Sequence, residues 1–206
     1  MAEIELEPGI FIRYEPTQNP YFAVIVIEAL KNIKTTATGT KLLKKISAAA
    51  PSSVPADFPG GCKVLILPTT ERIFIPQGFR RAFGELVANP GDKSKRPFNP
   101  TKLSGSCAYA SDVKSAQVAA GKGGGSGSTL EFNNTVTMTS RGETAHPFIV
   151  LAHELIHAYH ALYGTRKDGP AEELWTTGIQ GYEDEEITEN KIRKEAGIPE
   201  RAEYYS

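Results

Sequence analysis

The sequence predicts an α+β fold in which a small mixed sheet packs on one central buried helix, followed by a helical C-terminal subdomain. Three observations support this prediction. Short runs rich in β-branched and aromatic residues recur before residue 140. Residues 147–164 form one long apolar run with helix start and stop residues at its ends. The residues after it are acidic and contain a further short helical pattern.

Length and composition are those of an ordinary globular domain. The chain has 206 residues, of which 40% are hydrophobic and 23% charged, and its net charge is −1. We therefore expect residues 1–206 to form a single, monomeric domain with a core large enough to need no disulfides. A near-neutral charge argues against general nucleic-acid binding. No apolar run reaches eighteen residues, so we expect no membrane span.

Secretion and redox signals are weak. The N-terminus MAEIELEPGI has no basic region followed by an apolar stretch, so no classical signal peptide is expected. Cys62 and Cys107 are too few and too far apart in sequence for a disulfide framework or a CxxC metal site. Two free thiols are the favoured interpretation, and a single disulfide remains open.

The first ninety residues alternate between strand and helix patterns. Leu42, Leu43 and Ile46 recur at helical spacing with Lys41 and Lys44 on the other face, which is typical of an amphipathic helix. Three prolines and two glycines mark 51–61 as a loop. The remaining segments predict strands at 10–14, 63–67 and 72–75, and helices at 21–33, 40–48 and 77–88.

Residues 89–128 are rich in Gly, Ser, Pro and Lys and predict a flexible insertion. The run GKGGGSGS within it is not a phosphate loop, because no Ser or Thr follows Lys122. Strands are expected at 129–132 and 135–139. The basic run 92–122 and the acidic run 168–203 are interpreted as solvated surface, with complementary patches for a partner protein as the alternative.

The apolar helix at 147–164 carries the chemistry. His153 and His157 are four residues apart, so both imidazoles lie on one face and can reach a single ion. Glu154 completes the spacing H-E-x-x-H, in which a carboxylate beside the ligands acts on the water of a metalloprotease zinc. Zinc is the expected metal. His160 lies about 10 Å along the helix from His153, so we expect a buried histidine near the site rather than a ligand.

A catalytic zinc needs a third protein ligand, and acidic residues downstream offer several. Glu172 and Glu173 lie in a predicted short helix at 168–178, where one could bind zinc while the other orients a histidine. Spacing alone does not choose between these two and five further candidates, which are Glu183, Asp184, Glu185, Glu186 and Glu189.

The pair of motifs HELIHAYHALYG and EELWTTG resembles the light chains of botulinum and tetanus neurotoxins. The resemblance implies a zincin-like fold and assigns Glu173 as the third zinc ligand, with Glu172 behind it. A Thr-Glu pair followed by R-x-x-Y also matches the family pattern. It implies that Glu189 supports a zinc ligand and that Arg201 and Tyr204 act on the substrate carbonyl.

The chain is also similar to the NleD-like bacterial effector metalloproteases. The shared segments are GSGS followed by a strand, LAHELIHA, EELWTTG and TENKIRKEAG followed by R-x-x-Y, and they cover about residues 125–205. Trp175 stands where these families commonly have Arg, and 89–122 has the character of an insertion. Both departures concern substrate choice more than zinc chemistry.

Together these observations predict a zinc-dependent endopeptidase that cleaves a protein substrate. The resemblance implies a bacterial effector or toxin, delivered by a secretion system into the cytosol of a target cell. The alternatives are a bacterial regulatory metalloprotease, although no helix-turn-helix is found, and a zinc-binding module whose protease site has decayed. We further expect Ser128–Phe132 to be the edge strand that binds substrate, and 201–204 to bring Arg201 and Tyr204 together in a helical turn.

Overall fold

A computed structural model of the chain describes residues 1–69, 107–112, 116, 123–133 and 146–203. The strands expected at 72–75 and 135–139, the helix expected at 77–88 and Tyr204 lie outside these residues. No helix in the described ranges has the length and apolar character to cross a membrane. Cys62 is a buried free thiol, and burial raises its pKa to about 12.

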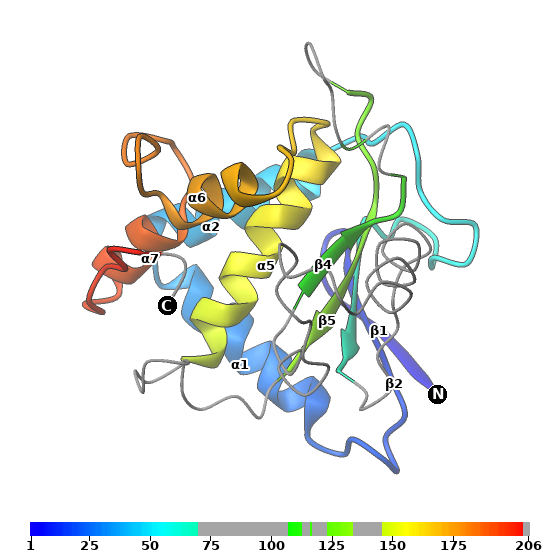
Figure 1. Cartoon of the computed structure of the whole chain (residues 1–206). Coiled ribbons are helices and arrows are strands. Elements are labelled where there is room, and N and C mark those ends of the chain that lie inside the picture. The colour runs from blue at the N-terminus through cyan, green and yellow to red at the C-terminus, as the bar shows by residue number, and fades with distance from the viewer. Residues whose placement is uncertain (70–106, 113–115, 117–122, 134–145, 204–206) are drawn as a thin grey trace, which may run out of the picture.

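Among the described residues the sheet is mixed and has the strand order β1-β2-β3-β5-β4 (Figure 1). The antiparallel pairs are β1 with β2 and β4 with β5, while β3 pairs in parallel with β2 and β5. This arrangement confirms the small mixed sheet expected from the sequence. The strands are β1 Ala2–Glu7, β2 Ile10–Tyr14, β3 Val64–Pro68, β4 Cys107–Ala110 and β5 Ser128–Phe132.

The prediction that Ser128–Phe132 forms the edge strand is wrong. This strand, β5, pairs with β3 on one side and with β4 on the other, so it lies inside the sheet. Its alternate residues Ser128, Leu130 and Phe132 are almost fully buried. The strand at this edge is β4, which lies within the segment 89–128 that was expected to be a flexible insertion. Its sequence, CAYA, contains no β-branched residue and therefore does not predict a strand.

The Gly/Ser-rich run after residue 122 is also more ordered than its composition predicts. The N–H of Gly123 donates to the carbonyl of Gly164 at 2.8 Å, and the N–H of Ser126 donates to Ala161 at 2.9 Å. Gly125 has a φ of +83°, and a Cβ there would lie 2.0 Å from the carbonyl oxygen of Leu162. The glycine is therefore required for close backbone approach, and the segment covers the C-terminal end of α5, Pro147–Leu162.

Helix α5 is the centre of the fold. It packs against β4 and β5 on one side and against the other four described helices on the other (Figure 1). Pro147 occupies its first turn, where the missing N–H costs nothing. The remaining helices are α1 Phe22–Lys34, α2 Ala37–Ala48, α6 Pro170–Thr177 and α7 Glu189–Glu195.

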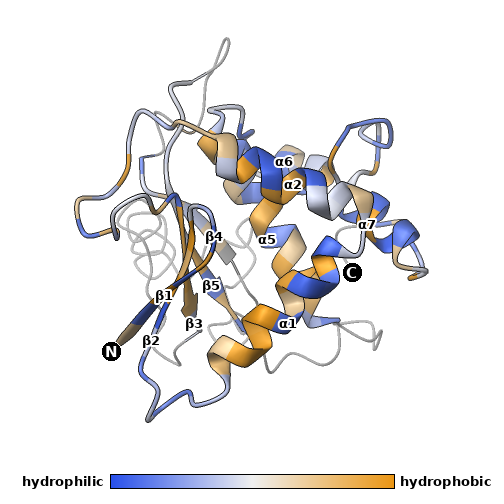
Figure 2. Ribbon diagram, turned by 180° about the vertical axis from the view of Figure 1, so that it is seen from behind, coloured by the Kyte–Doolittle hydropathy of each residue, from blue (hydrophilic) through white to orange (hydrophobic). Residues whose placement is uncertain are grey.

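The hydrophobic core lies between the sheet and the helices α1, α2 and α5. The apolar face of α1 and the inward residues of β2, β3 and β5 meet α5 there (Figure 2). Leu151 and Leu155 of α5 are fully buried, and burial of each side chain contributes about 1.5–3 kcal/mol. Because this apolar contact surrounds α5, the helix that carries the histidines is held rigidly.

Candidate metal centre

Helix α5 buries four ionisable side chains between its middle and its last turn. His153, Glu154, His157 and His160 are each less than 9% exposed. Burial of several such groups is expensive unless each finds a partner. The partners of the three histidines come from the two short helices that follow α5.

Helix α6 places two neighbouring glutamates on either side of His157. Gly178, with a φ of +82°, ends this helix in the left-handed conformation. Glu173 reaches the Nε2 atoms of His153 and His157, while the almost fully buried Glu172 reaches the Nδ1 atom of His157. The two carboxylates of the EE pair therefore have different roles.

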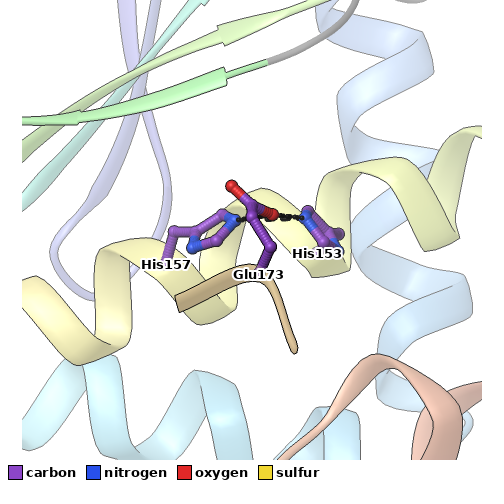
Figure 3. A group of neighbouring side chains, drawn as sticks. All are labelled: His153, His157 and Glu173. Carbon is purple, nitrogen blue, oxygen red and sulfur yellow. Dashed lines mark hydrogen bonds and ion pairs between the residues drawn. The ribbon is translucent and has the colours of Figure 1, made fainter. Parts of the chain in front are cut away.

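Three donor atoms converge at one point (Figure 3). Oε2 of Glu173 lies 3.2 Å from Nε2 of His153 and 3.1 Å from Nε2 of His157. The two Nε2 atoms lie 3.1 Å apart. Metals in proteins are commonly held by His, Cys, Asp and Glu side chains. Among the described residues, His153, His157 and Glu173 are the group of such side chains whose ligand atoms all lie within 4.8 Å of one another.

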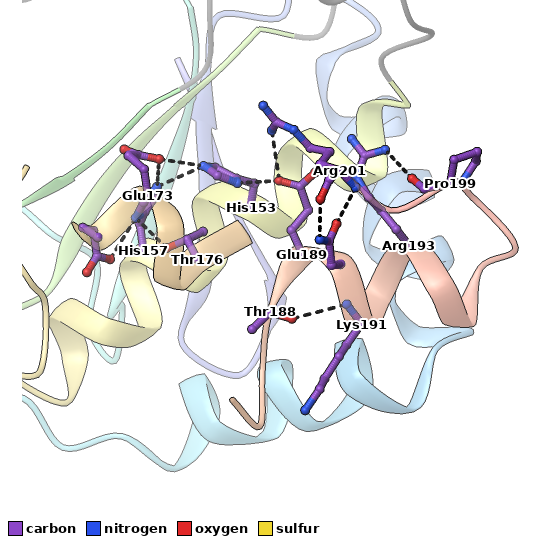
Figure 4. A network of polar contacts seen from close by, with 12 residues as sticks. His153, His157, Glu173, Thr176, Thr188, Glu189, Lys191, Arg193, Pro199 and Arg201 are labelled. Carbon is purple, nitrogen blue, oxygen red and sulfur yellow. Dashed lines mark hydrogen bonds and ion pairs between the residues drawn. The ribbon is translucent and has the colours of Figure 1, made fainter. Parts of the chain in front are cut away.

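The outer nitrogen of each histidine is occupied by a carboxylate (Figure 4). Nδ1 of His153 lies 2.7 Å from Oε2 of Glu189, and Nδ1 of His157 lies 2.9 Å from Oε1 of Glu172. A carboxylate only accepts, so each Nδ1 carries the proton. Each ring can then offer the lone pair of its Nε2 atom to a metal ion, next to the oxygen of Glu173.

The three converging atoms can each offer a lone pair, so they suit a cation. The combination of two imidazole nitrogens and one carboxylate oxygen suits zinc. Zinc binds two imidazole nitrogens and a carboxylate oxygen at about 2.0–2.2 Å in tetrahedral geometry. The edges of such a tetrahedron are roughly 3.3–3.5 Å. The observed separations of 3.1–3.2 Å approach these values. The residues can therefore hold a zinc ion with one position open.

The histidines and carboxylates of the site shift one another's pKa values. Burial works against protonation of His153, but the carboxylates of Glu173 and Glu189 outweigh it and raise its pKa to about 10. Burial works in the other direction on Glu172 and Glu173, yet their histidine partners hold both pKa values well below the usual range. The carboxylates are thus ionised, and the centre attracts positive charge.

Glu189 has a second set of partners. It accepts from Nε of Arg193, four residues along α7, and from Nη1 of Arg201 at 3.3 Å. Despite its burial, His153 and the two guanidinium groups lower its pKa to about 2. The backbone N–H and carbonyl of Arg201 both bond to the side chain of Asn190, each at 2.8 Å. The C-terminal segment is thereby attached to the metal centre.

The sequence-predicted residues are mostly brought together. Glu154 lies buried between the two histidines in sequence, and burial raises its pKa. The helical turn expected at 201–204 is absent from its described part, 201–203, and Tyr204 lies outside the described residues. The competing acids of the loop between α6 and α7 are exposed and lie outside the three-donor group, namely Glu183, Asp184, Glu185 and Glu186.

Two contacts at the site were not anticipated from the sequence. Oγ1 of Thr176 lies 3.1 Å from Nδ1 of His157, and Arg193 supports Glu189. Thr176 and Arg193 each lie four positions after a glutamate that the sequence had already indicated, Glu172 and Glu189 respectively. The i, i+4 spacing on a helix is therefore the signal that could have found them.

The fold is similar to that of known neurotoxin light chains. The crystal structure of the Clostridium botulinum neurotoxin serotype F light chain matches with a TM-score of 0.52 and 19% identity, over 86% of this chain and 56% of that one. The catalytic domain of the same serotype matches with a TM-score of 0.54 and 18% identity, over 94% and 59%. The chain thus spans less than two thirds of these light chains, and the likeness concerns the fold.

Sequence comparison gives the family. No match was found among curated proteins. The family model named Peptidase M91, described as "Effector protein", matches residues 11–204, which is nearly the whole chain. The chain therefore belongs to the Peptidase M91 effector protein family, which confirms the resemblance to NleD-like effectors.

Proposed function

We propose that the chain is a zinc-dependent endopeptidase that acts as one domain on a protein substrate. The convergence of His153, His157 and Glu173 on one point carries the proposal, because two imidazole nitrogens and a carboxylate oxygen 3.1–3.2 Å apart form a ligand set for a single zinc ion. The H-E-x-x-H spacing and the peptidase family match support a hydrolytic rather than a structural zinc.

In this proposal His153, His157 and Glu173 hold the zinc, which supplies a Lewis acid that activates water and polarises the scissile carbonyl. Glu172 and Glu189 fix the Nδ1–H tautomers of the two histidines through contacts of 2.9 and 2.7 Å. The two rings then need no rotation or proton shift to present Nε2.

Glu154 is the proposed general base. Its neighbours in sequence include His153, and its side chain is almost fully buried. Burial raises the pKa of its carboxyl, which favours a group that takes a proton from water and passes it to the leaving amine. Glutamine at this position would keep the shape and lose both transfers.

Arg201 and Tyr204 are proposed to act on the substrate. Arg201 is tied to Glu189 and Asn190, so its guanidinium is anchored beside the ligand His153. A fixed positive charge there orients a substrate carbonyl, and the phenol of Tyr204, three residues on, is a suitable oxyanion donor.

We further propose delivery into the cytosol of a target cell, where the substrate protein lies. The effector description of the family supports this route. The proposed substrate class is protein, and the enzyme is proposed to work as a monomer.

Profiling of new protein N-termini tests this function. A lysate of host cells is incubated with the zinc-loaded protein, and a parallel sample receives Glu154→Gln at the same concentration. We expect a small set of N-termini that only the active form generates. Identical profiles from the two forms would contradict the proposal and favour a zinc-binding module without protease activity. A bacterial repressor cleaved in a lysate of the source organism would instead favour a regulatory protease.

A further inference from the structure

His160 is buried in α5 beyond the metal ligands, and it shares a partner with one of them. It is 1% exposed and lies three residues after His157. Its Nδ1 atom is 2.8 Å from Oε1 of Glu172, and the same oxygen is 2.9 Å from Nδ1 of His157. One carboxylate oxygen thus joins His160 to the metal ligand.

The protonation of His160 follows from this contact. Glu172 accepts, so Nδ1 of His160 must donate. In the described part of the chain Nε2 of His160 has no hydrogen-bond partner, although it is buried. A bare nitrogen in this position costs less than a buried N–H without an acceptor. The ring is therefore neutral, with its only proton directed at Glu172.

The orientation of the His160 ring is also fixed. The ring stacks on Trp175 of α6, with centroids 3.7 Å apart and planes inclined by 11°. The ammonium of Lys167 lies 4.7 Å from the centroid of the same indole ring. The stack fixes the plane of the imidazole, and the contact with Glu172 then selects the orientation within that plane.

The carboxylate of Glu172 is consequently held at both oxygens. The backbone N–H of Lys167 donates to Oε2 at 2.8 Å, while the two histidines share Oε1. Without the donor from His160, Oε1 would retain only His157 among the contacts of the described residues. A less constrained carboxylate would fix the tautomer of His157 less strictly.

We propose that His160 is a positioning residue of the zinc centre, which acts on the ligand His157 through Glu172. This inference rests on the proposed function, because it assumes that His157 binds zinc. Trp175 serves the same arrangement from outside, since it holds the imidazole plane that aims Nδ1 at Glu172. The role requires the hydrogen-bond donor of His160 and not merely its ring.

Two substitutions separate the donor from the ring. His160→Phe keeps an aromatic ring that can stack on Trp175 but removes the donor. His160→Asn loses the ring but keeps an N–H close to the position of Nδ1. The matched control is His146→Phe, the same change at the N-cap of α5, where the ring packs on Phe148. Zinc affinity is measured by chelator competition, and the visible spectrum of the cobalt-substituted proteins reports ligand geometry.

We expect zinc affinity to fall about tenfold or more in His160→Phe, which is the lower part of the range for partners of metal ligands. His160→Asn and His146→Phe should stay within about threefold of the wild type, and the cobalt spectrum should change only in His160→Phe. Urea unfolding of the metal-free proteins verifies that each variant is folded. If His160→Phe does not fold, His160→Met replaces it as the donor-free variant.

An unchanged affinity in the donor-free variant would overturn the inference, and so would an equal loss in His160→Asn. The metal content of the wild type is measured first. If the wild type takes up zinc at His153 and His157 but His160→Phe is unaffected, only the role of His160 is wrong. If the wild type binds no zinc, the proposed function fails together with this inference.

Discussion

Glu173 and Glu172 are adjacent, and the structure predicts that their removal affects zinc very differently. Glu173 contributes one of the three converging donor atoms, whereas Glu172 contacts the outer nitrogen of His157, the ring of His160 and the backbone N–H of Lys167. Glu173→Ala therefore removes a ligand, and Glu172→Ala removes a support.

The size of each effect follows from the number of ligands. Zinc sites with four ligands bind with about 10–16 kcal/mol, or roughly 2.5–4 kcal/mol per ligand. Because about 1.4 kcal/mol corresponds to a factor of ten, Glu173→Ala should weaken zinc binding by roughly two to three powers of ten. Loss of a partner of a ligand typically costs about 10- to 100-fold, so Glu172→Ala should retain more zinc.

Chelator competition on the two purified variants measures both affinities against the wild type. Glu173 is partly exposed, so Glu173→Ala should fold normally, and urea unfolding of the metal-free protein checks this. The reverse order of affinities would identify Glu172 as the ligand. No loss in either variant would refute the assignment and direct the search to Glu183, Asp184, Glu185, Glu186 and Glu189.

Four further substitutions test other parts of the site. Glu154→Gln should keep its zinc and its fold but lose cleavage, and turnover near the wild-type rate would exclude Glu154 as the base. Arg201→Ala and Tyr204→Phe should each lower kcat roughly 10- to 1000-fold at unchanged zinc content, as for loss of one oxyanion donor; a variant ending at Pro199 that cleaves at the full rate would exclude both. Arg193→Ala should lower the free energy of unfolding by about 1.5–3 kcal/mol, because it removes one charge-assisted hydrogen bond of the buried Glu189 while His153 and Arg201 remain. A urea midpoint equal to that of the wild type would contradict this.

The central helix was predictable because its pattern is local. The apolar residues around His153 and His157, the proline at the start and the four-residue spacing all lie within one segment, Pro147–Leu162. The bounds of strand β2, Ile10–Tyr14, were also predicted correctly, because the signal for this strand is likewise contained in its own residues. The third ligand was different. Spacing left seven acidic residues open, and only the resemblance to known proteases indicated Glu173.

The errors arose where pairing between distant segments decides the structure. Whether β5 lies at the edge depends on β4, whose residues Cys107–Ala110 lie in a region of loop-like composition. The order of the Gly/Ser-rich segment depends on the free carbonyls at the end of α5, which are satisfied only after the chain has folded. Strand β1, Ala2–Glu7, was missed because three of its six residues are acidic and its Ile4 is exposed.

Anomalous diffraction at the zinc absorption edge, from crystals of the zinc-loaded wild-type protein, tests the metal centre most directly. The predicted result is one strong peak about 2.0–2.1 Å from the Nε2 atoms of His153 and His157 and about 2.0–2.2 Å from a carboxylate oxygen of Glu173. Glu172 and Glu189 should remain on the Nδ1 atoms of the two histidines. A peak bonded instead to Glu172 or to the acidic loop 183–186, or no peak at the histidines, would contradict the proposed zinc site.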